Sequence, residues 1–162
     1  MRGRVCCFLG HREINETEEL RQQLRCIAEK LILEEQVDTF LFGSKSQFNS
    51  LCHEEVSKLK EKYPDIKRVY VRVEFPMIND SYMDYLLESY EETYFSPRAV
   101  GAGRQRYVER NQDMIDKSEF CVVYHMDTYV PKNRKSGTKI AIKYAPSGKR
   151  KLYCYRWKRL NL

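Results

Sequence analysis

The chain has 162 residues, of which 42% are hydrophobic and 32% are charged. These values are typical of one globular domain with a full core, and they exclude an intrinsically disordered chain. The net charge of +6 is unevenly distributed, because residues 131–162 carry eleven lysines and arginines and no acidic residue. We interpret this segment as a solvated basic face, with attraction of nucleic acid or an anionic small molecule as the alternative.

Membrane and metal sites are not indicated by the sequence. The longest apolar runs are too short to span a bilayer, and the N-terminal residues 1–4 lack the apolar region of a signal peptide. The six cysteines show neither Cys-x-x-Cys spacing nor a cysteine–histidine cluster of the kind that binds zinc. Most of them fall in predicted strands and helices, so we expect buried, reduced thiols in a cytoplasmic protein.

A short apolar run over residues 5–10 stops abruptly in Gly10-His11-Arg12. Its β-branched, aromatic and thiol side chains predict a strand buried on both faces. Glycine at the strand end permits a tight turn and the close approach of a ligand. His11 and Arg12 would then stand at the carboxyl end of the strand, where open α/β sheets bind their ligands, and both suit a phosphate. The alternative is a plain strand with a surface turn, in which His11 is a structural histidine.

Strands and helices alternate through the rest of the first half. The pattern predicts a helix over 13–35 capped by Thr17 or Asn15, a strand over 38–42, a helix over 47–63, and a strand over 66–73. The second strand stops at Gly43-Ser44, as the first stops at Gly10. Alternation over these lengths predicts βαβ units with a parallel sheet and right-handed crossovers.

Residues 74–104 interrupt this alternation. They contain a predicted helix over 80–89, no regular strand, and the tyrosines Tyr82, Tyr85, Tyr90 and Tyr94. Long insertions in compact domains are commonly lids, binding loops or partner surfaces. The alternative is that the tyrosines pack the insertion onto the sheet.

The second half resumes with a predicted helix over 105–117 and a buried strand over 119–124 that is followed by His125. Ser136-Gly137-Thr138 opens a predicted helix over 139–145, and a last strand follows over 151–155. Small residues at a helix start expose backbone N–H groups, so we expect an anion cradle there.

The whole pattern predicts an α/β fold. We expect one Rossmann-like domain over 1–162, with a doubly wound, mostly parallel five-stranded sheet, helices on both faces and a tyrosine-rich insertion at about 74–104. A strand order of 3-2-1-4-5 would put the switch point between the first and fourth strands. Gly10-His11-Arg12 and the 125–138 loop would line the crevice, with Gly43-Ser44 beside it. The chain has no Walker loop, no dinucleotide fingerprint and no nucleophile elbow.

Four ordered motifs, spread over roughly residues 4 to 156, resemble the YpsA-like branch of the SLOG superfamily. They are Cys7-Phe8-x-Gly10-His11-Arg12, Phe40-x-x-Gly43 with Phe48, Arg110-Asn111-x-x-Met114-Ile115-Asp116-x-Ser118, and Ser136-Gly137-Thr138 with Tyr144-Ala145. The resemblance implies a Rossmann-like module, related to the LOG phosphoribohydrolases and to the DNA-processing protein DprA. It implies a nucleotide-derived ligand at the glycine-bearing strand ends. Some relatives sense NAD-derived signals in antiphage defence, so a bacterial or phage setting and a homodimer paired through helices are expected.

Two departures from the family pattern favour binding over catalysis. LOG enzymes follow the Gly-Thr pair with a catalytic glutamate, but here Gly137-Thr138 is followed by Lys139, Ile140 and Ala141. YpsA-like proteins commonly carry an aspartate where this chain has Asn49, which can still hydrogen-bond to a ribose hydroxyl.

The expected ligand-binding residues are Gly10, His11, Arg12, Gly43, Ser44, Phe48, Arg110, Asn111, Ser136, Gly137 and Thr138. Arg12 would pair with a phosphate, with a surface salt bridge as the alternative. Neighbours on a helix point about 100° apart, so only one of Arg110 and Asn111 need face the crevice. Asp116 is expected to orient Arg12 or to cap a loop.

The leading hypothesis is that the chain binds or senses a nucleotide, an NAD-derived or an ADP-ribose-type ligand without catalysis. The first alternative is a nucleotide N-glycosidase, which would need a crevice carboxylate from Glu109, Asp113 or Asp116. The second alternative is nucleic-acid binding through the basic C-terminal segment. No cofactor or metal is assigned.

Overall fold

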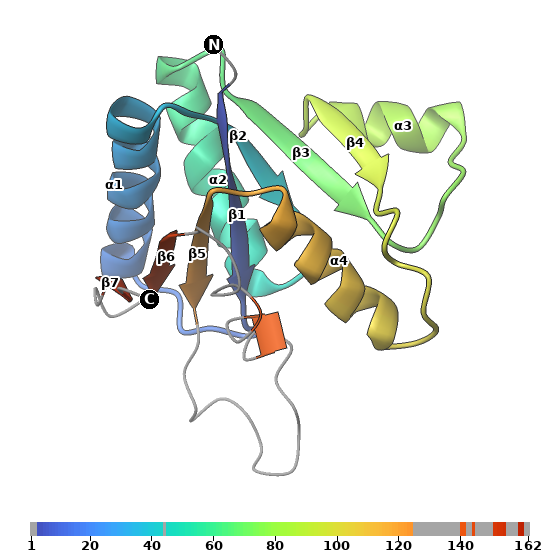
Figure 1. Ribbon diagram of the computed structural model, residues 1–162. Coiled ribbons are helices and arrows are strands. Elements are labelled where there is room, and N and C mark those ends of the chain that lie inside the picture. Colours follow the sequence, from blue (N-terminus) through green and yellow to red (C-terminus); the bar gives the residue numbers. More distant parts are fainter. Residues whose placement is uncertain are drawn as a thin grey trace.

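A computed structural model gives the architecture of the chain (Figure 1). It describes residues 3–43, 45–124, 140, 141 and 144, and the backbone of 151–154 and 159–160. The strands are β1 (Arg4–Gly10), β2 (Val37–Phe42), β3 (Lys67–Arg72), β4 (Glu92–Phe95), β5 (Phe120–Tyr124), β6 (Lys151–Cys154) and β7 (Arg159–Leu160). The helices are α1 (Glu18–Glu35), α2 (Gln47–Lys62), α3 (Asp80–Leu87) and α4 (Gln105–Asp116).

All strands belong to one sheet with the order β4-β3-β2-β1-β5-β6-β7. Strands β1 to β6 pair in parallel, and β7 pairs antiparallel to β6. The five predicted strands are present in the predicted order, and the switch point lies between β1 and β5. The α/β, Rossmann-like, doubly wound fold is therefore confirmed.

The sheet is longer than predicted at both edges. The prediction that residues 74–104 contain no strand was wrong, because Glu92–Phe95 pairs with β3. Four residues of mixed polarity, of which none is fully buried, carry too little alternation to be recognised as a strand. At the other edge, β7 adds two residues that the sequence did not indicate.

Successive side chains along the central strands enter two separate cores. On one face, Cys6 and Phe8 pack against α1 and α2. On the other face, Cys7 and Leu9 pack against Met114 of α4. This alternation explains why β1 reads as a continuous apolar run: each of its faces is covered by helices (Figure 1).

The insertion packs onto the sheet through only some of its tyrosines. Tyr90 packs against the α1/α2 core, with its ring 4.7 Å from that of His53, and Tyr94 packs against the α4 core. Tyr85 on α3 is 65% exposed. Tyr82 faces the pocket described below. Packing onto the sheet is therefore confirmed for Tyr90 and Tyr94, whereas a lid, binding loop or partner surface formed by the others stays a prediction.

The cysteines whose side chains are described are all free thiols. Cys6, Cys7, Cys52 and Cys121 are buried, as expected, and Cys26 is exposed. None of the helices in the described part of the chain is long and apolar enough to cross a bilayer.

Candidate functional site

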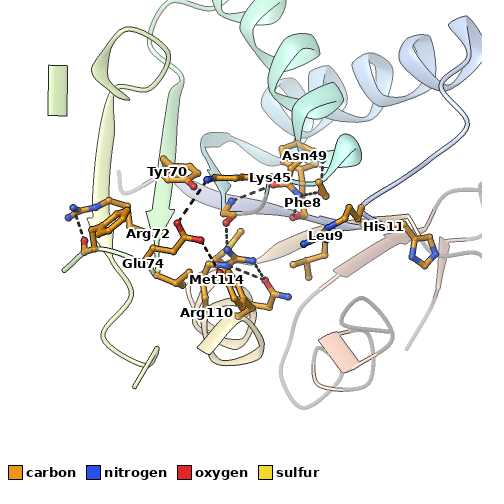
Figure 2. A pocket seen from close by; sticks show the side chains of 18 of the residues that line it. Phe8, Leu9, His11, Lys45, Asn49, Tyr70, Arg72, Glu74, Arg110 and Met114 are labelled. Atoms are coloured by element: carbon orange, nitrogen blue, oxygen red, sulfur yellow. Dashed lines mark hydrogen bonds and ion pairs between the residues drawn. The ribbon is translucent and has the colours of Figure 1, made fainter. Parts of the chain in front are cut away.

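A pocket of about 370 Å³ opens where β1, β2 and β3 reach their carboxyl ends (Figure 2). Its walls come from these strand ends, the start of α2, the residues after β3, Tyr82 of α3, and one face of α4. Open α/β sheets bind their ligands at this edge. The pocket extends from β1 toward β3, whereas the sequence pointed to the switch point between β1 and β5; the 125–138 loop expected there lies outside the described residues.

The predicted site residues divide into three groups. The ones that line the pocket are Gly10, His11, Arg12, Gly43, Arg110 and Asn111. The ones that lie outside the described residues are Ser44, Ser136, Gly137 and Thr138. His125 and most of the basic C-terminal segment also lie outside them. Phe48 forms the third group.

Phe48 is completely buried in the core and does not line the pocket. The structure therefore gives Phe48 a packing role, and its expected contact with a ligand stays a prediction. Its ring lies under the end of β1, 5.5 Å from the Tyr124 ring. A methyl group on Gly10 would lie 2.3 Å from Cδ1 of Phe48, so a glycine is needed there to make room for a core aromatic ring.

Gly43 makes room in a similar way for α4. A methyl group on Gly43 would lie 2.7 Å from Sδ of Met114 and 2.9 Å from Cδ of Arg110. The helix can therefore approach the end of β2 closely. The Nη1 group of Arg110 donates a hydrogen bond to the carbonyl oxygen of Gly43. Because residue 43 has no side chain, α4 lies close enough for the Arg110 guanidinium to line the pocket.

Arg110 is a buried cation without an acidic partner. The residue is only 4% exposed, and burial lowers its pKa to about 10. Within the described residues, no Asp or Glu oxygen lies within 4.0 Å of its guanidinium nitrogens. The charge of Glu74 favours the charged form of Arg110 from a greater distance, but burial outweighs it. A buried charge without an ion-pair partner costs free energy, and such groups concentrate at functional sites.

The hydrogen bonds of Arg110 leave part of its donor capacity unused. Nη2 and Nε donate to Oδ1 of Asn111 at 3.2 and 3.4 Å, and Nη1 donates to Gly43. A guanidinium has five N–H bonds, so one N–H remains on each of the two η nitrogens. N–H donors on both η nitrogens of an arginine can bind the oxygens of a phosphate or a carboxylate. Asn111 also lines the pocket, so both neighbours face it and Asn111 holds Arg110 in place.

Three further basic side chains line the pocket, namely Arg12, Lys45 and Arg72. Arg12 is exposed and makes no ion pair with any described residue.

The expectation that Asp116 orients Arg12 was wrong, because the Asp116 carboxylate binds Arg98 and the Tyr144 hydroxyl. His11 is 8% exposed, and its ring meets that of Tyr124 edge-on at 6.0 Å. The cations give the pocket an excess of positive charge.

Among the described residues that line the pocket, Glu74 is the one carboxylate. Its Oε1 accepts a hydrogen bond of 2.9 Å from the Tyr107 hydroxyl, and its Oε2 lies 4.0 Å from Nζ of Lys45. Figure 2 shows Glu74, Lys45 and Arg110 directed toward the same space. Sequence reasoning missed Glu74, although it directly follows the third predicted strand, as His11 follows the first.

The three carboxylates considered from the sequence are engaged elsewhere. Glu109 accepts hydrogen bonds from the backbone of Val100 and Gly101 at 3.2 and 3.0 Å. Asp113 binds the Tyr94 hydroxyl and Lys117. Neither these two residues nor Asp116 lines the pocket.

Asn49 holds two strand ends together beside the pocket. It is 3% exposed, and its Nδ2 donates to the carbonyl of Phe8 at 3.2 Å and to Oγ of Ser46 at 3.3 Å. Its Oδ1 accepts from the Gly43 amide at 3.4 Å. Through these bonds Asn49 positions the ends of β1 and β2. It also lines the pocket, and its Oδ1 keeps one lone pair, so its expected contact with a ribose hydroxyl stays a prediction.

Aromatic side chains form the wall of the pocket next to β3. They are Tyr70, Phe75, Tyr82 and Tyr107. Of these, only Tyr82 belongs to the set of insertion tyrosines singled out in the sequence. Tyr107 lies three residues before Arg110 on α4, a spacing that places both on one helix face and was available from the sequence.

Comparison of the chain with models of known protein families and with curated proteins finds no match.

Proposed function

We propose that this chain binds a nucleotide-type ligand, with a phosphate group held by Arg110. The observation that carries this proposal is the buried guanidinium of Arg110, which has no acidic partner among the described residues and keeps one N–H on each η nitrogen. A phosphate would supply a negative charge within ion-pair distance of the guanidinium and acceptors for its two remaining N–H groups. Arg12, Lys45 and Arg72 would add to the attraction.

The rest of the pocket suits the other parts of a nucleotide. Tyr70, Tyr82 and Tyr107 offer ring faces on which a base can stack. Glu74 repels phosphate but accepts hydrogen bonds, so it suits the hydroxyl groups of a sugar. Small-molecule sites commonly combine an apolar or aromatic wall with a few polar groups that fix the ligand's orientation.

The resemblance to the YpsA-like branch of the SLOG superfamily supports the same ligand class. We further propose that the chain acts as a cytoplasmic sensor of such a ligand, including NAD-derived and ADP-ribose-type molecules, and works as a homodimer. This part of the proposal depends on the resemblance alone.

A thermal-shift screen tests the proposal. The panel contains inorganic phosphate, AMP, ADP-ribose and NAD, tested against the wild type and against Arg110→Lys and Arg110→Ala. A ligand at a hundred times its dissociation constant should add about 2.7 kcal/mol of stability. Arg110→Lys should weaken the effect, because lysine keeps the charge and loses the fork, and Arg110→Ala should abolish it.

The matched control is Arg98→Ala, which removes an arginine that pairs with Asp116 away from the pocket. It should leave every ligand-induced shift unchanged. If no member of the panel stabilises the wild type, or if Arg110→Ala responds as the wild type does, the proposal is wrong.

A second candidate function is hydrolysis of the bond between base and sugar, with Glu74 as the acidic group. The observation that favours it is the carboxylate in the pocket, which an N-glycosidase requires. Incubation with a panel of nucleoside monophosphates, followed by chromatography of the released bases, tests it. Release that Glu74→Gln abolishes would support hydrolysis, and a complete lack of release by the wild type would exclude it for that panel.

A further inference from the structure

An exposed group of aromatic rings continues from the pocket onto the surface of the insertion. We call it the aromatic ledge, and it consists of Phe75, Tyr82 and Tyr85. From its position we propose that the ligand is a dinucleotide: one nucleotide unit occupies the pocket and the second base stacks on the ledge. This inference rests on the proposed function, because the first unit is held by Arg110.

The ledge is continuous with the pocket. Phe75 and Tyr82 line the pocket, and their rings meet at nearly a right angle with centroids 6.3 Å apart. Tyr85 follows one turn later on α3, outside the pocket, and its ring is nearly parallel to that of Tyr82 at 6.1 Å. A ligand that leaves the pocket past Tyr82 would therefore meet a second aromatic face.

The exposure of these rings is unexplained by packing. Phe75 is 55% exposed and Tyr85 is 65% exposed, and the intervening Met77 is 87% exposed. By contrast, Tyr90 and Tyr94 of the same insertion are packed against the sheet. Contiguous exposed apolar side chains beside a pocket commonly mark a binding surface. Aromatic faces outside a phosphate pocket suit a second base, since every base has a π-face to stack.

The volume of the pocket also supports a ligand with one nucleotide unit inside the pocket and the second outside it. Its volume of about 370 Å³ is near the lower end of the range of roughly 300–1,000 Å³ for small-molecule sites. The pocket has room for one nucleotide unit, so the second unit of a dinucleotide must lie outside it. The ledge is the aromatic surface that adjoins the opening.

Charge on the two sides of the ledge limits the length of the ligand. Arg72 lines the pocket and donates from Nη1 to the Phe75 carbonyl at 3.2 Å, so a cation lies next to the ledge to attract the linking phosphates. Exposed acidic residues at four-residue spacing lie on the helix that carries Tyr82 and Tyr85: Asp80 and Asp84 belong to α3, and Glu88 follows it directly. They would repel the phosphates of a longer strand, so the site favours a dinucleotide over a nucleic acid.

Titration calorimetry tests the inference with three probes: AMP, NAD and a single-stranded octanucleotide. The variants are Tyr85→Ala, which removes the outer ring, and Tyr85→Phe, which keeps it. Leu87→Ala is the matched control, because Leu87 is an exposed apolar residue on the same helix outside the ledge. Arg110→Ala reports on the pocket itself.

We expect the wild type to bind NAD more tightly than AMP. Tyr85→Ala should weaken NAD binding by about 5- to 150-fold, the range expected for one stacked base, and leave AMP binding unchanged. Tyr85→Phe and Leu87→Ala should bind both ligands as the wild type does. Arg110→Ala should lose both.

The other outcomes contradict either the inference alone or the inference together with the proposed function. Equal affinity for AMP and NAD, with no effect of Tyr85→Ala, overturns the inference and leaves the proposed function intact. Tighter, salt-dependent binding of the octanucleotide overturns it in favour of a nucleic-acid strand. Lack of binding of every probe by the wild type overturns the proposed function and the inference together.

Discussion

The guanidinium of Arg110 and the carbonyl oxygen of Gly43 form a hydrogen bond across the pocket wall, joining α4 to the end of β2. The contact is possible because residue 43 has no side chain. The position of the positive charge in the pocket therefore depends on the glycine at the end of β2.

Gly43→Ala should impair both stability and ligand binding. The added methyl group would lie closer than 3.0 Å to Met114 and Arg110, so α4 must shift. We expect a loss of about 1–3 kcal/mol, the usual range for overpacking, and at least a partial loss of phosphate-dependent stabilisation. Urea unfolding with and without phosphate measures both effects. Gly103→Ala is the control: it strains a residue with φ of 60° but has no neighbour within 4 Å, so it should lower stability without changing the response to phosphate.

Arg110→Met should leave the unliganded protein about as stable as the wild type, or more stable. Burial lowers the pKa of Arg110 to about 10, so folding disfavours its charged form, and that cost is fully present below pH 10. Replacing a buried charge by an apolar side chain is commonly neutral or stabilising, although Gly43 loses a donor. Thermal unfolding at pH 7 should give a melting temperature at or above the wild-type value, with no increase on adding phosphate. A loss of more than about 3 kcal/mol would contradict this account.

Asn49→Asp should destabilise the protein by about 1–3 kcal/mol, because the Nδ2 donor would be replaced by an oxygen facing the Phe8 carbonyl. The ends of β1 and β2 would separate, so ligand affinity should fall as well. Chemical denaturation and a binding titration measure the two effects. Asn79→Asp is the matched control: Asn79 caps α3 through its side-chain oxygen, a role that aspartate fills equally well, so neither quantity should change.

Glu91→Gln should loosen the insertion and remove a pH dependence. Burial alone would raise the pKa of Glu91, but hydrogen bonds and charge from Arg68, with Lys60, lower it to about 2. A carboxylate with a lowered pKa contributes stability that is present above about pH 4.5 and is lost as the pH falls toward 2. The variant should therefore be less stable by about 1–3 kcal/mol at pH 7, with a smaller deficit at pH 3.

The control for this experiment is Glu92→Gln, which removes the neighbouring exposed ion pair with Lys67. Exposed pairs contribute about 0–1 kcal/mol, so this variant should stay close to the wild type at both pH values. A deficit at Glu91 that is equally large at pH 3 and pH 7 would mean that the ion pair with Arg68 does not hold the insertion.

Sequence patterns were sufficient for the fold because strong signals specify its central strands. The apolar runs that end at Gly10 and Gly43 correspond to β1 and β2, and the alternation of β3 was also evident. The strand at Glu92–Phe95 was missed because its residues are of mixed polarity and its pairing depends on β3. A short edge strand is determined by its tertiary partner more than by its own sequence.

The candidate site was only partly predictable for a similar reason. Strand ends are visible in a sequence, so Gly10, Arg12 and Gly43 were found, and the motif around Arg110 marked α4. The function of each glycine was not visible, because it depends on which side chain approaches from a helix. Phe48 was predicted to contact the ligand because the sequence does not show that its ring packs against Gly10. Glu74 and Tyr107 acquire significance only through their mutual hydrogen bond, which joins residues 33 positions apart.

The two ends of the sheet restrict how copies of this chain can associate. The outermost strands are β4, with four residues, and β7, with two. Strand-to-strand pairing between molecules needs a row of unpaired backbone groups. Edge strands this short offer an incoming strand few backbone hydrogen bonds. Edge-to-edge extension into larger sheets is therefore disfavoured. For the described part of the chain, helical surfaces are therefore the better candidates for contact between copies, because side chains rather than backbone hydrogen bonds decide the partner there.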